Sequence, residues 1–266
     1  MCGAAVLFAA SANAASDRGS GRIIAAKVHG LVTALNKANN IRKELHDSDA
    51  VYAGYVVTTA AKSSVVLLFA NGSAVNLGED SSLSIDEFLM DPFDAKYSAA
   101  DAKDEPSTSV TKLTLARGEM VGNVKHLHRE SGSSYSITTP VGAAGIRGTT
   151  YRIAFRPDST GKMIFALSTA EGLVGLGAAD GTTPLIPAGK QLDVKFDATT
   201  NPDTGEASIV PGSLQILGLG DISPEIQAEI AAAVAEILAN ETNPDAGGSQ
   251  GAIVPPSNTT PGDGKG

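Results

Sequence analysis

Polar and apolar residues alternate with a period of two over most of residues 22–196, and glycine or Asn-Gly interrupts the alternation repeatedly. The alternation in residues 65–69 stops at Asn71-Gly72 and resumes in residues 75–77. A spacing of two places side chains on alternate faces of a strand, and Asn-Gly favours a tight hairpin turn. The pattern predicts an all-β domain of short strands, either a β-solenoid of the twin-stranded β-helix type or a sandwich-like fold.

Residues Phe88 to Ser109 break this pattern, because they are rich in Asp, Ala and Ser and include two prolines. We interpret 88–109 as a long excursion from the β domain, and loops of this length are either functional or mobile. Asp158 to Lys162 is predicted to be a hairpin loop between two strands of similar length.

The pattern changes again after Asp197. Residues 197–222 are linker-like, and Ser223 followed by Pro224 is a typical start of a helix, here predicted over 223–241. The helix would present one apolar stripe, which either packs on the β domain or contacts another chain: Ile226, Ile230, Val234, Ile237 and Leu238. Residues 242–266 are rich in Gly, Pro, Ser and Asn, and we expect a disordered tail.

The first 15 residues are typical of a secretory signal peptide, with an apolar run and then Ala12-Asn13-Ala14. We expect cleavage after Ala14 and export to the periplasm or the cell surface. The charged beginning of such a signal is absent, so either the natural start lies upstream or the signal is truncated. The alternative is a short buried strand or helix. Cys2 is the only cysteine, so the mature chain would have no disulfide and no thiol nucleophile.

Charge and hydropathy narrow the functional classes. The formal net charge is -9, with no basic run, which argues against a nucleic-acid partner because phosphate binding depends on Lys and Arg. No stretch after the leader approaches 18 uninterrupted apolar residues, so we expect no transmembrane segment.

The stretch TTPVGAAGIRGTTY, residues 138–151, raises the question of a phosphate-binding loop, because Gly142, Gly145 and Gly148 recur at a spacing of three. A P-loop requires a lysine after its last glycine and a following helix, whereas Gly148 is followed by Thr149 and a strand-like segment. The dinucleotide-binding spacing also fails. Without a helix N-terminus the stretch lacks the physical basis of an anion site, and a corner between strands is the better interpretation.

Other candidate sites are equally incomplete. His126 and His128 would share one face of a strand, but no third ligand is near in sequence, and we expect a solvent-facing pair. The acidic turns at 158–162 and 201–206 lack the alternating ligands of a calcium loop. No Gly-x-Ser-x-Gly motif is present. We therefore expect no enzyme, no metal and no cofactor.

The chain resembles the FecR family, named for a regulator of ferric-citrate transport in Gram-negative bacteria. The resemblance extends from Lys27 to Val194, and its most specific part is the Thr-Pro-x-Gly and Arg-Gly-Thr core. The supporting segments are VHGLV, YAGYVVTTAAKSSVVLLFANGSAVNLG, SSLSI, LARGEMV, YSITTPVGAAGIRGTTYRI, AEGLVGL and IPAGKQL. The matching motif residues, to which we assign structural roles, are Gly72, Thr139, Pro140, Gly142, Arg147, Gly148, Thr149 and Gly172.

The resemblance implies an exported, non-enzymatic interaction or sensing module whose partner is an envelope protein or a cell-wall component. In the regulators a sigma-factor-binding segment and a transmembrane helix precede this domain, and neither is found in this sequence. Two other functions are considered: a structural surface protein that self-associates through the helix, and a carbohydrate-active enzyme with paired carboxylates in one cleft. For Arg147 we expect hydrogen bonds to carbonyl groups that the turn leaves unpaired.

Overall fold

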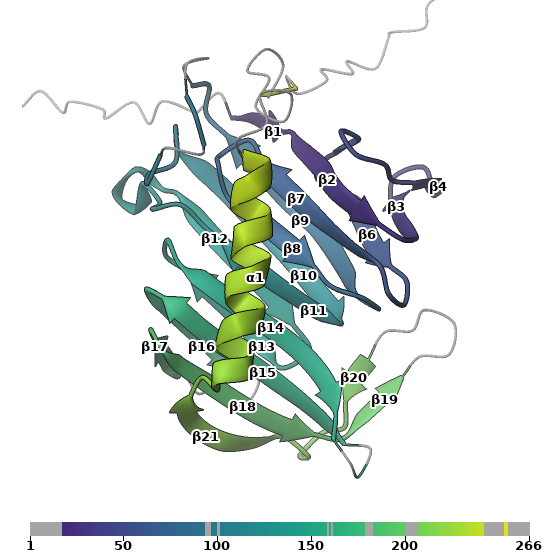
Figure 1. The fold of residues 1–266 in the computed structure, drawn as a ribbon, viewed down its shortest axis with the longest axis vertical. Coiled ribbons are helices and arrows are strands. Elements are labelled where there is room, and N and C mark those ends of the chain that lie inside the picture. Colours follow the sequence, from purple (N-terminus) through teal and green to yellow (C-terminus); the bar gives the residue numbers. More distant parts are fainter. Residues whose placement is uncertain are drawn as a thin grey trace, which may run out of the picture.

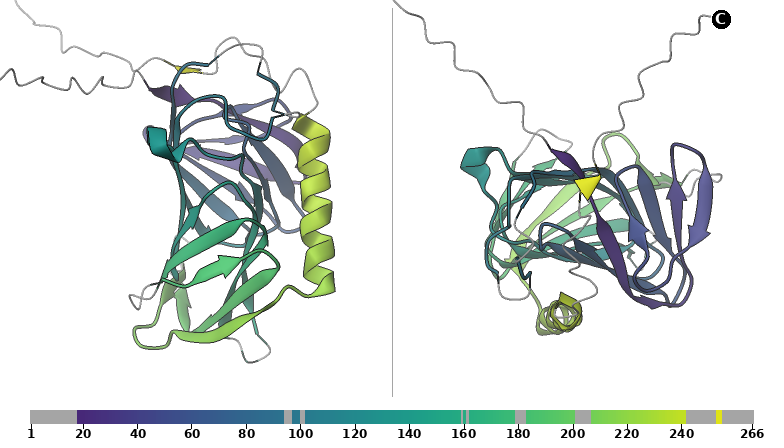
Figure 2. Two further views of the ribbon diagram at one scale, coloured as in Figure 1. Left: turned by 90° about the vertical axis from the view of Figure 1, so that its left-hand side faces the viewer. Right: turned by 90° about the horizontal axis from the view of Figure 1, so that it is seen from above.

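A computed structural model describes residues 18–93, 97–99, 102–158, 160, 162–178, 183–200, 207–241 and 253–254. Two large sheets pack face to face, and one long helix lies outside them (Figures 1 and 2). The prediction of an all-β domain with a C-terminal helix is confirmed, and of the two architectures considered the chain adopts the sandwich. The predicted leader, 1–15, lies outside the described residues.

The first sheet has the strand order β17-β16-β13-β12-β10-β9-β6-β3-β4, and β1 pairs with β9. All described pairs in it are antiparallel except β10 with β12, which run parallel. Its strands are β1 (Gly19–Gly21), β3 (Val32–Asn36), β4 (Ile41–Glu44), β6 (Tyr55–Thr59), β9 (Ser82–Met90), β10 (Ser109–Arg117), β12 (Ser134–Thr139), β13 (Gly142–Ile146), β16 (Leu173–Ala178), β17 (Leu185–Pro187) and β22 (Ile253–Val254).

The second sheet has the order β21-β18-β15-β14-β11-β8-β7-β2-β5. A separate small hairpin, β19 with β20, follows β18 in the chain. These strands are β2 (Ile23–His29), β5 (Ala50–Val51), β7 (Ser64–Phe69), β8 (Ala74–Leu77), β11 (Glu119–Asn123), β14 (Thr150–Pro157), β15 (Met163–Glu171), β18 (Lys190–Phe196), β19 (Ala198–Thr200), β20 (Ala207–Ile209) and β21 (Gln215–Asp221).

The chain repeatedly passes from one sheet to the other, and glycines form several of these corners. Gly148 leads from β13 to β14 with φ +81°, and Gly172 leads from β15 to β16 with φ +80°. Residues other than glycine rarely adopt this left-handed conformation. The interpretation of residues 138–151 as a corner between strands is thereby confirmed at Gly148.

The inward faces of the two sheets form one continuous core, in which Phe69 and Phe88 meet edge to face at 5.1 Å. Strand β7 is buried on both faces. Val65 and Leu67 point into this core, whereas Val66 and Leu68 belong to a second cluster on the outer face of the sheet. A strand with both faces apolar requires a covering layer on each side.

The covering layer on the outer face is the helix α1 (Pro224–Glu241), which packs along β7, β8 and β11. Figure 2 shows it lying against the outer face of the second sheet. Ser223 caps it as expected, since its Oγ accepts the N–H of Ile226 at 3.3 Å. Ile230 and Ile237 are buried against the sheet, whereas Leu238 is 45% exposed. Most of the predicted apolar stripe therefore serves packing within the chain.

An ion-pair network also attaches the helix to the sheet. Arg152 on β14 is buried, and its Nε and Nη2 donate to the two carboxylate oxygens of Glu119 at 2.6 and 2.9 Å. Glu229 of α1 lies 3.1 Å from Arg152 and 3.3 Å from Arg156. Because a buried guanidinium requires a charged partner, this network fixes the position of α1 over β11 and β14.

Three predicted boundaries are corrected. The range 197–222, predicted as a linker, contains β19, β20 and β21, and β21 pairs with β18 along the edge of the second sheet. Among its described residues, Pro211 and Gly212 lie in a turn, and Gly218 and Gly220 lie in the bulged strand β21. The excursion is shorter than 88–109, because β9 continues to Met90. Within the predicted disordered tail, Ile253–Val254 pairs with β1, and the rest lies outside the described residues.

Candidate functional site

The stretch 138–151 begins with a two-residue hairpin turn. Thr139 and Gly142 are paired at the ends of β12 and β13, and Pro140 and Val141 form the turn. The Thr139 hydroxyl donates to the carbonyl of Gly142 at 2.8 Å and accepts its N–H at 3.2 Å. Residues 142–146 are therefore a strand, which the interpretation as a simple corner did not include.

Small residues point outward from this hairpin. Along β13 the inward residues Ala144 and Ile146 are buried, so Gly145 faces out, opposite Ser136 on β12 and Gly175 on β16. A β-carbon placed on Gly145 would meet only the carbonyl of Gly175, at 3.9 Å. This glycine is therefore not required by the backbone, and its effect is to leave the surface hollow.

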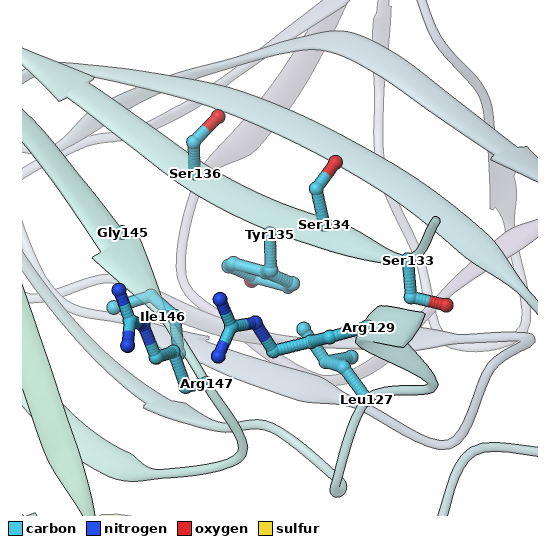
Figure 3. Close-up of a pocket in the computed structure, with 9 residues that line it drawn as sticks. All are labelled: Leu127, Arg129, Ser133, Ser134, Tyr135, Ser136, Gly145, Ile146 and Arg147. Carbon is cyan, nitrogen blue, oxygen red and sulfur yellow. The ribbon is translucent and has the colours of Figure 1, made fainter. Parts of the chain in front are cut away.

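The hollow is a groove of about 330 Å³ between β12, β13 and the short 3-10 helix η1 (Arg129–Ser131). Figure 3 shows Arg129 and Arg147 near the ring of Tyr135, whereas the hydroxyl groups of Ser134 and Ser136 point away from the two arginines. The lining residues are Leu127, Arg129, Ser133, Ser134, Tyr135, Ser136, Gly145, Ile146 and Arg147.

The two arginines reach the groove from different parts of the fold (Figure 3). Arg129 belongs to η1, and Arg147 directly follows β13. Both side chains are exposed. Neither guanidinium group makes a hydrogen bond or an ion pair with any residue that the structure describes. The carbonyl contacts expected of Arg147 are therefore not found, because the side chain points outward and the β12–β13 ladder satisfies the neighbouring backbone groups.

A buried carboxylate holds the wall of the groove in place. Glu105 is 2% exposed, and it accepts the hydroxyl of Ser109 at 2.5 Å and the backbone N–H of His128 at 2.7 Å. The hydroxyl of Ser133 accepts the N–H of Ser109 at 3.1 Å. The excursion thus positions the segment from which Arg129 projects.

The two candidate histidines do not form a pair. His126 lies 3.6 Å from a carboxylate oxygen of Asp104, and Nε2 of His128 lies 2.9 Å from the carbonyl of Glu105. Both are exposed, as expected, and both contact the excursion. Among the described residues, no group of three or more His, Cys, Asp or Glu could hold a metal ion.

The buried tyrosines beneath the groove do not supply a general acid or a general base. Burial raises the pKa of Tyr135, whose hydroxyl lies 3.4 Å from that of Tyr151 in the core. Burial also raises the pKa of Tyr151. Both phenols stay protonated at neutral pH. The groove can bind a ligand by charge and hydrogen bonds, and its lining offers no carboxylate or imidazole for catalysis.

The remaining motif residues lie at turns. Gly72 has φ +80° in the β7–β8 hairpin, where the predicted Asn-Gly turn is confirmed. Thr149 is buried at the corner after Gly148, and its carbonyl accepts the N–H of Val124 at 3.0 Å. A β-carbon on Gly172 would lie 3.0 Å from the carbonyl of Gly148, so these two corners touch.

Sequence reasoning singled out Arg147 but not Arg129, Ser134 or Ser136. The serines could have been found from the period of two in β12, which places 134 and 136 on the outward face. Arg129 could not, because η1 reaches the groove only through the contacts of Glu105.

Among the part of the chain that is described, no helix has both the length and the apolarity needed to cross a membrane. No curated protein matches the chain. Two crystal structures, each of a putative anti-sigma factor from Parabacteroides distasonis ATCC 8503, are similar to it. One is 13% identical with a TM-score of 0.37, and the match covers 57% of this chain and 57% of that chain, less than two thirds of its length. The other is 12% identical with a TM-score of 0.41, covering 70% and 74%.

The comparison with protein families agrees with the motifs in residues 138–151, which include the turn of the β12–β13 hairpin beside the groove. Residues 55–175 match the model of the FecR protein family, and this range runs from β6 into β16 and includes both arginines of the groove. Residues 55–175 are therefore similar to the FecR protein family, as the motifs of residues 138–151 had indicated.

Proposed function

We propose that the protein is an exported, non-enzymatic binding module of a regulatory system, which recognises a protein or cell-wall component of the envelope of a Gram-negative bacterium. The match of residues 55–175 to the FecR family is the observation on which the proposal rests. The leader-like first 15 residues support export, and the groove with two unpaired arginines supports binding.

Neither alternative function has an observation of comparable weight. A glycosidase needs two carboxylates that face each other, and none lines this groove. Self-assembly through α1 would need an apolar face free for a partner, but Ile230 and Ile237 are buried against the second sheet.

Co-purification from the envelope fraction, with the tagged mature chain as bait, tests the proposal. We expect one or a few proteins or cell-wall fragments to be recovered reproducibly. A variant unfolded by two core substitutions controls for adhesion to the resin. Recovery of the same set with the unfolded variant, or of nothing reproducible, would count against a binding module.

A further inference from the structure

The two arginines of the groove differ from the other arginines of the chain, because their side chains have no partner among the described residues. The guanidinium groups of Arg129 and Arg147 make no hydrogen bond or ion pair within the part that the structure describes, yet both arginines line one groove. Every other arginine has an interaction partner within the chain: Arg18, Arg22, Arg42, Arg117, Arg152 and Arg156. In a chain with 29 acidic and 20 basic residues, two neighbouring arginines whose side chains have no partner of any kind are unexpected.

The form of the groove suits an extended ligand with anionic side chains. Gly145 and Gly175 are paired on β13 and β16, and because neither has a side chain the face of the sheet is open there. The partly buried Leu127 provides an apolar surface on which the methylene groups of a glutamate side chain can pack. The rigid guanidinium forks match carboxylates in two-point hydrogen bonds.

The charge of the whole molecule argues for a short anionic ligand. A net charge of -9 repels extended polyanions such as nucleic acids and anionic membrane surfaces. Two arginines within one groove can offset that repulsion only locally. A short acidic segment of a protein has enough negative charge to pair with the two arginines, and too little for the net charge of the molecule to repel it strongly.

We propose that the groove between β12, β13 and η1 binds an acidic peptide segment of a partner protein, with Arg129 and Arg147 each pairing with a carboxylate. This inference rests on the proposed function, because it names the chemistry of the partner that the binding module recognises.

Fluorescence anisotropy of the full mature chain with a labelled, capped tetraglutamate peptide tests the proposal. We expect saturable binding that weakens as salt is added, and no binding of tetraglutamine. The double variant Arg129→Gln/Arg147→Gln should lose about tenfold or more in affinity, since each substitution removes a charge-assisted hydrogen bond. A matched double variant, Arg42→Gln/Lys62→Gln, removes the same charge from exposed positions outside the groove lining and should bind as the wild type does.

Gly145→Val separates the shape of the groove from its charge. The added side chain faces outward and meets only the Gly175 carbonyl near its β-carbon, so the fold should persist while the groove is filled. We expect this variant to lose peptide affinity with no fall in melting temperature. Equal peptide binding by the wild type and the arginine double variant, or no binding by the wild type, would overturn the proposal. So would saturable binding of inorganic phosphate or of phosphatidylglycerol vesicles at this groove in the absence of peptide binding.

The envelope co-purification distinguishes failure of this inference from failure of the proposed function. If the wild type and the arginine double variant recover the same partner equally well, the groove is not its docking site, although the chain is still a binding module. If the wild type recovers nothing reproducible, the binding module itself is contradicted.

Discussion

Gly148 connects the two sheets directly beside the groove, in a conformation that other residues rarely adopt. Its φ is +81°, and a β-carbon there would lie 2.8 Å from Cδ2 of His126 and 2.9 Å from its Cα. We expect Gly148→Ala to lower the free energy of unfolding by about 2–3 kcal/mol, as backbone strain and a clash with a main-chain atom combine. Urea unfolding monitored by circular dichroism measures this change.

Gly189 supplies the matched control for that substitution. Its φ is +77°, but nothing lies within 4 Å of a β-carbon placed there. Gly189→Ala should therefore cost only the backbone term, about 1 kcal/mol. Equal losses at the two glycines would show that the contact with His126 contributes nothing.

The carboxylate of Asp86, on β9, gives the stability a defined dependence on pH. It accepts hydrogen bonds from Thr114, Ser84 and Lys37 at 2.6, 2.7 and 3.1 Å. Burial raises the pKa of Asp86, but these hydrogen bonds outweigh burial and hold the pKa below its usual 3.8. A carboxyl group with a lowered pKa stabilises the folded state above its unfolded-state pKa, and the stabilisation is lost as the pH falls through the folded pKa.

We therefore expect Asp86→Asn to destabilise the protein at pH 7, by no more than about 1 kcal/mol because the carboxylate is partly exposed. The difference from the wild type should be constant from pH 7 to about 5 and should shrink as the pH falls further, through the unfolded-state pKa of 3.8 and then the lower folded pKa. Urea unfolding of both proteins across this range provides the measurement. A difference that stays constant with pH would mean that the charge of Asp86 plays no part.

The helix α1 is stabilised mainly by packing on the second sheet. Ile237 is fully buried among Ala26, Val66, Leu68 and Ala74, whereas the neighbouring Leu238 is 45% exposed. Ile237→Ala should cost about 2 kcal/mol or more, and Leu238→Ala less than about 0.5 kcal/mol. Hydrogen exchange of the α1 amides would show the loss in the helix itself. Similar effects at both positions would indicate that the helix does not dock as described.

Local patterns predict those elements whose partners are near in sequence. The Asn71-Gly72 turn and the Ser223-Pro224 helix start were both predicted correctly, because hairpins and caps depend on a few adjacent residues. The unbroken run of apolar residues in β7 also contains information that the period-of-two interpretation did not use. Apolar residues on both faces indicate a strand covered on both sides, here by the core and by α1.

Elements stabilised by distant partners were missed. Strand β21 contains glycines and exposed leucines and has no clean alternation, and only its pairing with β18 makes it a strand. The same applies to the groove, because Arg129 reaches it through the buried contact of Glu105 with His128. Sequence reasoning identified the hairpin with Arg147, but the meeting of two arginines depends on tertiary structure.

At the scale of the whole molecule, the helix and the groove belong to different layers. Helix α1 covers the outer face of the second sheet, while β12 and β13 belong to the first sheet (Figure 2). A variant that ends after Ile222 would lose the helix and expose Val66, Leu68 and Val121 on the second sheet. Exposed apolar strips of this kind promote aggregation.

We expect this truncated variant to bind a hydrophobic dye, to scatter more light as its concentration rises and to melt at a lower temperature. At low concentration it should still bind tetraglutamate, because the groove lies on β12 and β13 of the first sheet, whereas α1 packs on β7, β8 and β11 of the second. Light scattering and anisotropy on the same samples measure the two properties. If instead the full chain is an oligomer and the truncated variant a well-behaved monomer, α1 is an interface between copies rather than a cover for the sheet.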